Sequence, residues 1–382
     1  MRKNSPKDLW QRESKPDIRF AAATGRIRVL EEKMLSEEDF LHLADPHVSF
    51  SQRREILNKA GYSGEGSNEQ VILQGRDKQD RLLYELSEGT NLATVLLMDL
   101  DYHNLKAIVR FLLLEQHEQQ AAASRAQTQT ESFVKEYQAD IPPKLKPLIR
   151  ETAPTSPELL FDVVVDLMRG ETVDRPEELR PMFFDHIKEV TDIAGSGREM
   201  SAADLLADRL CFEEMLAEAE KTKQSSFRQF LLDYISIVAD EENLESFLRV
   251  RRGHGSKDFL ARALVPGGKV SPEELLALFD AEREELTALF QKSYVSAVMD
   301  PVPPYRDRAD IRAFGIMKDE ILMRLALLGK KAAAGGEAVL GFWLAKRLEM
   351  RKIRVILQAA GRGMRQEEIM PLIRPADKGY ER

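Results

Sequence analysis

Apolar side chains recur along most of the chain every three or four residues, which is the period of an amphipathic α-helix. Alternation at the period of a β-strand is nearly absent, so the sequence predicts an all-α fold. The clearest helical patterns lie within residues 37–45, 103–117, 157–170, 227–250, 272–291 and 341–361.

Proline and glycine mark the expected connections between these patterns. The stretch 115–133 is polar and rich in alanine and glutamine, so it can be either a solvated helix or a connector. The glycine- and proline-rich connections lie within residues 62–70, 141–147, 194–199, 252–257, 265–272 and 300–305.

Three sequence elements recur in the same order, which indicates an internal triplication. The first is a helix start, in which Ser36, Ser156 and Ser271 stand at N-cap positions before Pro or Glu. Their hydroxyls can accept from unpaired N–H groups, and proline at the first helical position loses no hydrogen bond. These serines lie 120 and 115 residues apart. Ser36 with Asp39 and Ser271 with Glu274 resemble capping boxes.

The second element is an acidic residue with an aromatic residue one turn later, and the third is a helix with four residue types at fixed spacing. The second element comprises Asp80 and Tyr84, Asp208 and Phe212, and Asp310 and Phe314. The third comprises Asp101, Asn104, Leu105 and Arg110, then Asp240, Asn243, Leu244 and Arg249, and a degraded copy with Glu349, Lys352, Ile353 and Gln358.

The third element favours a structural role. Asp101 and Arg110 lie two and a half helical turns apart, so they face different neighbours and cannot pair with each other. Leu105 and Leu244 are expected in the core. The triplication predicts three similar helical domains around a pseudo-threefold axis. Their expected bounds are a polar extension over 1–17 and domains over 18–145, 146–262 and 263–382.

Composition limits the class of protein. The net charge is −8, which disfavours general nucleic-acid binding because that depends on neutralising phosphates. The single cysteine, Cys211, excludes an intrachain disulfide and fits a reducing compartment. It lies on the apolar side of a helical pattern and is expected to be a small buried side chain. No signal peptide and no apolar run of about 20 residues is evident, so no spanning helix is expected.

Motifs for enzyme chemistry are not found. The sequence lacks a phosphate-binding loop, the H-E-x-x-H and C-x-x-C metal patterns and the G-x-S-x-G elbow, and its six histidines are scattered. Asp101 and Asp240 could be proposed as an acid–base pair. Each stands just before Asn-Leu, however, where an acidic side chain near a helix N-terminus would complement the helix dipole. We therefore expect no catalytic, cofactor or metal site.

The last long helical pattern is strongly basic in a chain that is acidic overall. One interpretation is a solvated basic face, and the other is a basic lining for an acidic partner or membrane surface. The basic residues are Lys346, Arg347, Arg351, Lys352, Arg354, Arg362 and Arg365.

Several of these segments together resemble the C-type subunit of archaeal and bacterial V/A-type ATPases, a family related to the d-type subunit of the eukaryotic vacuolar enzyme. The resemblance extends from about residue 18 onward and depends on the order and number of short motifs. They are an arginine-rich first helix, the D-x-x-N-L helices, and a closing E-x-x-x-I-R-x-I with Glu349, Ile353, Arg354 and Ile356.

The resemblance implies a funnel of three helical domains with no catalytic site of its own. It implies a socket on the cytoplasmic face of the membrane that links the rotary shaft to the proteolipid ring and transmits torque for ion transport. The expected partners are the D- and F-type shaft subunits and the ring, with the stator subunit nearby and one copy per complex. Arg347, Arg351 and Arg354 are the candidate partner contacts.

Four features depart from the family pattern: the extension over 1–17, the expanded connections within 61–80 and 115–140, and the segment 154–160, which lacks the P-x-G of its later counterpart over 265–276. Two other classes stay open. A general helical scaffold that binds partner helices would share the fold, although solenoid repeats have periods of about 34–47 residues. An all-α metal-dependent enzyme would need clustered acidic residues, which we do not find in the sequence.

Overall fold

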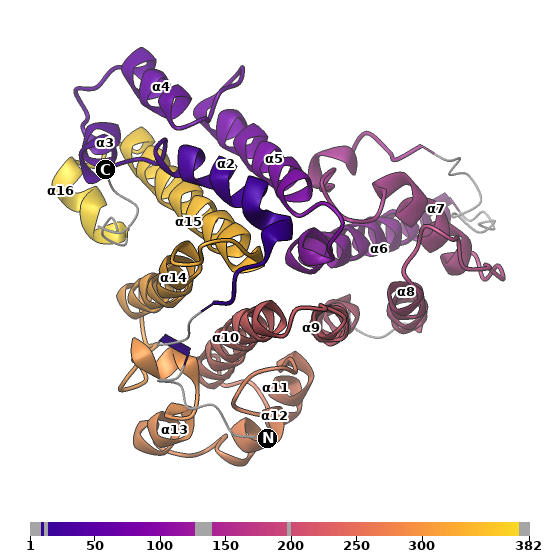
Figure 1. Cartoon of the computed structure of the whole chain (residues 1–382). Helices are drawn as coiled ribbons and strands as arrows, with labels where there is room; N and C mark the ends of the chain where they lie inside the picture. The colour runs from indigo at the N-terminus through magenta and orange to yellow at the C-terminus, as the bar shows by residue number, and fades with distance from the viewer. Residues whose placement is uncertain (1–8, 11–13, 127–139, 197–199, 374–382) are drawn as a thin grey trace. The chain divides into compact units, whose positions relative to one another are not determined.

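The computed structural model describes residues 9–10, 14–126, 140–196 and 200–373 (Figure 1). Every regular element within these ranges is a helix, which confirms the all-α prediction. The chain forms two compact units. Unit 1 comprises Met1–Ala93, Ala219–Gly255 and Gly267–Arg382, and unit 2 comprises Thr94–Glu218 and Ser256–Pro266. The pseudo-threefold arrangement and the three domain bounds stay predictions.

Unit 1 is built around its last long helix, α15 (Gly336–Gly361), which packs against α14, α5, α3 and α2 (Figure 1). The other elements of unit 1 are η1 (Ile18–Phe20), α2 (Ala21–Glu31), α3 (Glu37–Ala44), α4 (Phe50–Lys59), α5 (Asn68–Leu86), α10 (Ser225–Arg252), α12 (Pro272–Ala277), α13 (Arg283–Phe290), η4 (Tyr294–Ala297), α14 (Arg308–Lys330), α16 (Gln366–Ile369) and η5 (Met370–Leu372).

The core of unit 1 joins sequence segments from both ends of the chain. Leu43, Tyr62 and Val71 from the first part meet Ile353 and Ile356 of α15, and all five side chains are fully buried. Burying a large apolar side chain contributes about 1.5–3 kcal/mol, so this shared core holds α15 against α3 and α5.

Helices α14 and α15 approach each other closely because glycines face one another. A Cβ atom on Gly341 would lie 2.7 Å from the carbonyl oxygen of Ala326, and one on Gly329 would lie 2.3 Å from that of Glu337. Both distances are too short for any larger residue, so glycine at these positions sets the separation of the two helices.

Unit 2 contains most of α6 and α9, and its core is formed by bulky apolar side chains such as Leu105, Phe161, Phe183 and Ile187. Its elements are α6 (Leu92–Ala126), η3 (Lys146–Leu148), α7 (Pro157–Met168), α8 (Pro181–Gly195), α9 (Met200–Glu220) and α11 (Lys257–Ala263). Cys211 is buried on α9, as the apolar pattern predicts.

The predicted helix starts are confirmed. Ser36, Ser156 and Ser271 are the N-caps of α3, α7 and α12, and each hydroxyl accepts from a backbone N–H three residues later. The capping boxes of Ser36 with Asp39 and of Ser271 with Glu274 are complete.

Two helix boundaries differ from the sequence interpretation. The expected loop over 61–80 is helical from Asn68, because Ser67 and Gln70 form a capping box and the ring of Tyr62 packs against Gly75 in mid-helix. The continuous pattern over 272–291 is split into α12 and α13, since Glu282 and Glu285 form a new capping box between them. The segment 115–140 is helical as far as Ala126, and 127–139 lie outside the described residues.

Candidate functional site

Three arginines of α15 form a row along one side of this helix, which we call the basic row: Arg347, Arg351 and Arg354. Their spacing of four and three residues places them on neighbouring turns of one face. The side chain of Arg347 is 26% exposed and that of Arg351 is 56% exposed. Arg354 is exposed.

The three arginines differ in how strongly the protein holds them. Arg347 donates to the buried carboxylate of Asp80 on α5 over 3.3 Å, and its guanidinium lies 4.6 Å from the ring centre of Trp343. Arg351 pairs with Asp319 of α14. Arg354 is exposed to solvent, so it is the member of the row most available to a partner.

Two lysines of the same basic segment are buried, which corrects the solvated-face interpretation for them: Lys346 is 3% exposed and Lys352 is 5% exposed. Lys346 pairs with Glu349, donates to the carbonyl of Ala60 over 3.2 Å, and lies 4.5 Å from the ring centre of Tyr62. A buried ammonium group is tolerated only when it is paired in this way.

The three acidic residues of the repeated helices make the same hydrogen bond, which we call the carboxylate clasp. Glu349 accepts from the backbone N–H of Leu35 over 2.6 Å, Asp101 from that of Thr155 over 2.9 Å, and Asp240 from that of Val270 over 3.1 Å. In each case the donor immediately precedes the serine N-cap of another helix. The clasp of Glu349 joins the last long helix to the start of α3.

The clasp corrects the expected role of Asp101 and Asp240. Both lie in the middle of their helices, α6 and α10, and not near an N-terminus where the helix's own dipole would act on them. Burial raises the pKa of both carboxyls to about 6, although the hydrogen bonds and positive charges around them act to lower the pKa. Each carboxyl instead fixes the backbone before another helix: Asp101 binds the N–H of Thr155, and Asp240 binds that of Val270.

Each clasp has additional partners. Arg180 donates to Asp101 over 2.8 Å and also to Glu214. Asp240 accepts from the backbone N–H of Lys269 over 3.1 Å and from the hydroxyl of Ser293. Arg180, Glu214 and Ser293 carry no recognisable sequence signal, so the sequence did not reveal them.

The other repeated residues anchor neighbouring segments. Asn104 exchanges two hydrogen bonds with the backbone of Arg150, at 3.0 and 2.8 Å, and Arg110 donates to Asp204 of α9 over 2.9 Å. Asn243 is fully buried, as are Leu105 and Leu244. Arg249 pairs with Glu245 on its own helix.

Ion pairs also join each long repeated helix to the second-element helix of another repeat. Lys106 of α6 pairs with Asp208 of α9, and Lys318 of α14 pairs with Glu242 and Glu245 of α10. The pair of Arg347 on α15 with Asp80 on α5 is the third case. Each of the helices α6, α10 and α15 therefore makes one connection of this kind.

Reactive side chains gather in the core of unit 2, around Tyr102. Its hydroxyl lies 2.5 Å from Nδ1 of His186 and donates to Glu214 over 2.8 Å. Burial raises the pKa of Tyr102 and of the Cys211 thiol and lowers the pKa of His186. All are less than 10% exposed, and these shifts keep the phenol, thiol and imidazole neutral, so the cluster serves as a packed polar network.

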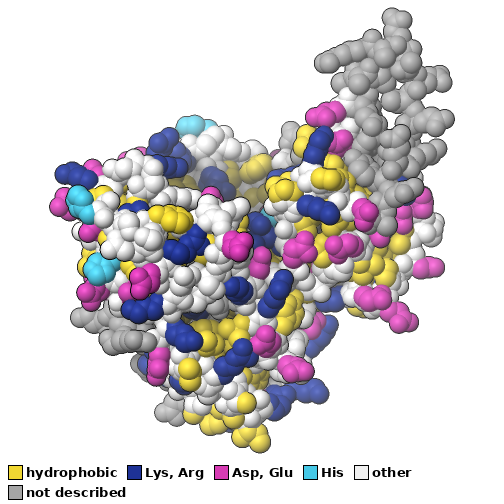
Figure 2. Space-filling model, turned by 90° about the horizontal axis from the view of Figure 1, so that it is seen from above, with side chains coloured by type: hydrophobic (Ala, Val, Ile, Leu, Met, Phe, Trp, Pro, Cys, Tyr) yellow, Lys and Arg dark blue, Asp and Glu magenta, His cyan; other side chains and the backbone are white. Residues whose placement is uncertain are grey.

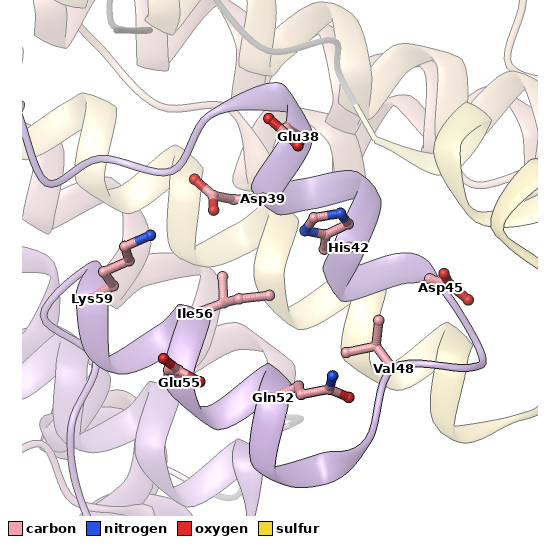
Figure 3. Close-up of a pocket in the computed structure, with 9 residues that line it drawn as sticks. All are labelled: Glu38, Asp39, His42, Asp45, Val48, Gln52, Glu55, Ile56 and Lys59. Atoms are coloured by element: carbon pink, nitrogen blue, oxygen red, sulfur yellow. The ribbon is translucent and has the colours of Figure 1, made fainter.

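A groove of about 510 Å³ lies between α3 and α4 (Figure 3). Its acidic side chains project from both helices, with Glu38 and Asp39 on α3 and Glu55 on α4. Asp39 is already used in the cap of α3, and Asp45 accepts from the N–H of His47 over 2.8 Å. The lining is Glu38, Asp39, His42, Asp45, Val48, Gln52, Glu55, Ile56 and Lys59.

Charge on the face seen in Figure 2 is mixed, since Lys and Arg side chains lie among Asp and Glu side chains and apolar areas. Such a surface does not favour a polyanion. Within the described ranges, no group of three or more His, Cys, Asp or Glu side chains could hold a metal ion. No helix among the described residues is long and apolar enough to cross a membrane.

A family model described as the ATP synthase (C/AC39) subunit matches residues 23–372, which is nearly the whole chain. No curated protein matches.

Proposed function

Because the chain belongs to the C/AC39 family of V/A-type ATPase subunits, we propose that it is the socket of the central stalk. In this role it links the rotary shaft to the membrane proteolipid ring, transmits torque for coupled ion transport, and has no catalytic site of its own. One copy would sit on the cytoplasmic face of the membrane, bound peripherally between the D- and F-type shaft subunits and the ring, with the stator subunit nearby.

The carboxylate clasp is the observation that supports this function best. A part that transmits torque must not deform under load, so its helices need fixed connections at their ends. The clasp supplies the same buried hydrogen bond, from a backbone N–H to a carboxyl group, at three helix starts. Arg28 adds a further tie, because it donates to the carbonyls of Lys330 and Ala332 at the end of α14.

The basic row is the proposed contact with the shaft. Arg354 is exposed, and Arg351 is half exposed although it pairs with Asp319. Guanidinium groups on a rigid helix suit bidentate pairing with carboxylates of a partner helix. Such contacts steer association and weaken as salt rises.

The test is calorimetric titration of the isolated shaft heterodimer into the purified chain at two salt concentrations. We expect one-to-one binding that weakens at high salt, and a loss of about tenfold or more for the double variant Arg351→Glu with Arg354→Glu. Arg283→Glu, an exposed charge reversal on α13, is the matched control and should bind normally.

The variants separate the contact surface from the function itself. If the wild type binds the shaft and the double variant binds it equally well, the basic row is not the contact surface, although the socket function still stands. No binding by the folded wild type, with or without the ring, would favour the general helical scaffold instead.

A further inference from the structure

Unit 2 carries an apolar groove of about 350 Å³ that the proposed socket function does not use. It is lined by Ile193 of α8, by Ala202, Leu205, Leu206 and Arg209 of α9, and by Arg262 of α11. The four apolar side chains are half-buried, and both arginines are exposed. Apolar side chains left partly open to water mark interaction sites, and arginine is enriched at protein interfaces.

We propose that this groove binds an amphipathic α-helix of a partner protein, with apolar side chains inserted between the leucines and acidic side chains along its edges. The proposal concerns a surface of unit 2, whereas the basic row belongs to unit 1. It therefore stands independently of the shaft contact.

The periodicity of α9 supports a helical partner. Ala202, Leu205, Leu206 and Arg209 follow the spacing i, i+3, i+4 and i+7, so they form one continuous face about 10 Å long. A face of two turns matches two turns of a second helix packed alongside, with one apolar side chain of each turn entering the groove.

The backbone around the groove excludes an added β-strand. The groove lies on α8, α9 and α11, whose interior N–H and C=O groups are already paired within their own helices. An extended peptide would find no main-chain partners there, whereas a helix satisfies its own backbone.

The charges at the rim favour acidic residues in the partner. Arg209 makes only a loose ion pair with Glu213 at 3.6 Å, and the guanidinium of Arg262 lies 5.8 Å from the ring centre of Phe259. Two acidic residues of α9 near the groove are engaged elsewhere, because Asp204 pairs with Arg110 and Asp208 with Lys106. Both arginines can therefore turn toward an incoming carboxylate.

A lipid chain fits the groove less well than a helix. An acyl chain extends about 15 Å through one leaflet, which is longer than the two-turn apolar face, and the groove is open along its side. A membrane surface is the alternative occupant of the groove that the test must distinguish from a helix.

The probe is a fluorescein-labelled synthetic peptide of four helical turns, with leucines along one face and glutamates along both edges. Fluorescence anisotropy with the full chain should show saturable binding below about 100 µM, as expected for a small interface. Leu206→Asp should weaken binding at least tenfold, because it places a carboxylate in the apolar groove. Leu114→Asp, at an exposed leucine of α6 outside the groove, is the matched control and should bind as wild type.

Charge reversal gives the sharper test. Arg209→Glu should weaken binding of the glutamate peptide, and binding should return when the peptide carries lysine in place of glutamate. Arg252→Glu, an exposed reversal on α10, should change neither peptide's affinity. Melting curves within a few degrees of wild type would show that the variants are folded.

Three results would overturn the proposal: no saturable binding by the wild type, equal binding by Leu206→Asp and wild type, or a scrambled peptide that binds as well as the amphipathic one. Competition by vesicles of anionic phospholipid that is lost in Leu206→Asp would assign the groove to a lipid surface and would also refute the helix.

Discussion

At the scale of single residues, Glu349 is the clasp residue that also neutralises a buried lysine. It accepts from the N–H of Leu35 and from the hydroxyl of Tyr62, at 2.6 and 2.5 Å, and it pairs with Lys346. Burial and the Glu349 charge raise the pKa of Tyr62, so the phenol stays a hydrogen-bond donor. This one carboxylate thus satisfies three donors that would otherwise be buried without partners.

Glu349→Ala should destabilise unit 1 by about 3–5 kcal/mol, because it leaves the buried Lys346 ammonium without its counter-ion. The measurement is urea unfolding followed by tryptophan fluorescence, since Trp343 lies on the same helix. Glu85→Ala, which removes an exposed ion pair with Arg26, should cost less than about 1 kcal/mol. Equal midpoints for the two variants would show that the clasp contributes little.

Asp240 should make stability depend on pH with an unusual sign. Its pKa is about 6 in the folded chain against 3.8 for an ordinary Asp, so the folded state keeps a proton that the unfolded state releases. Stability from this group is complete below pH 4 and is lost as pH rises through 6, by at most about 3 kcal/mol.

The free energy of unfolding is measured against pH for the wild type and for Asp240→Asn. The wild-type value minus the variant value should fall between pH 4 and 6. Glu274→Gln provides the contrast, because the hydrogen bond from Lys292 lowers the pKa of Glu274. Its contribution to stability is present at neutral pH and is lost as pH falls, so its difference curve should slope the other way. Two curves of the same slope would refute the assignment for Asp240.

At the scale of helices, α14 and α15 pack around glycines. Gly341→Ala should destabilise the chain by about 1–3 kcal/mol, because the new Cβ would lie 2.7 Å from the carbonyl oxygen of Ala326 and the helices must separate. Gly315→Ala on α14 meets nothing within 4 Å and should stabilise by up to about 1 kcal/mol through helix propensity. Thermal melting measures both, and a loss for Gly315→Ala as large as that for Gly341→Ala would contradict this packing.

Helix starts could be predicted from the sequence because a cap is a local interaction. Ser36, Ser156 and Ser271 need only residues three positions away to show their role. The start of α5 at Asn68 was missed although Ser67 and Gln70 form a local capping box, because Gly75 reads as a loop residue until the ring of Tyr62 is seen against it. Local pattern identifies an element well, and tertiary packing decides where it ends.

The sequence predicted the acidic residue of each clasp but not its partner. The repeated spacing correctly singled out Asp101, Asp240 and Glu349, but their partners Thr155, Val270 and Leu35 contribute backbone N–H groups, which carry no side-chain signal. The basic segment of α15 was likewise visible as a charge excess. Only three-dimensional packing separates its buried lysines from Arg354 in solvent.

At the scale of the whole molecule, the clasps connect segments that are far apart in the sequence. Glu349 and Leu35 are separated by 314 positions, yet one hydrogen bond joins the last long helix to the start of α3. Helices α3 and α15 come from opposite ends of the chain and share one core and one clasp, so neither can separate from the other without breaking buried contacts. The proposed torque-transmitting socket would require this property.

The most direct test of the socket is assembly of the shaft heterodimer and the detergent-solubilised proteolipid ring with and without this chain. Size-exclusion chromatography should show shaft and ring in one peak when the chain is present at one copy, and in separate peaks when it is omitted. Co-elution of shaft and ring to the same extent without the chain would contradict its role as their link.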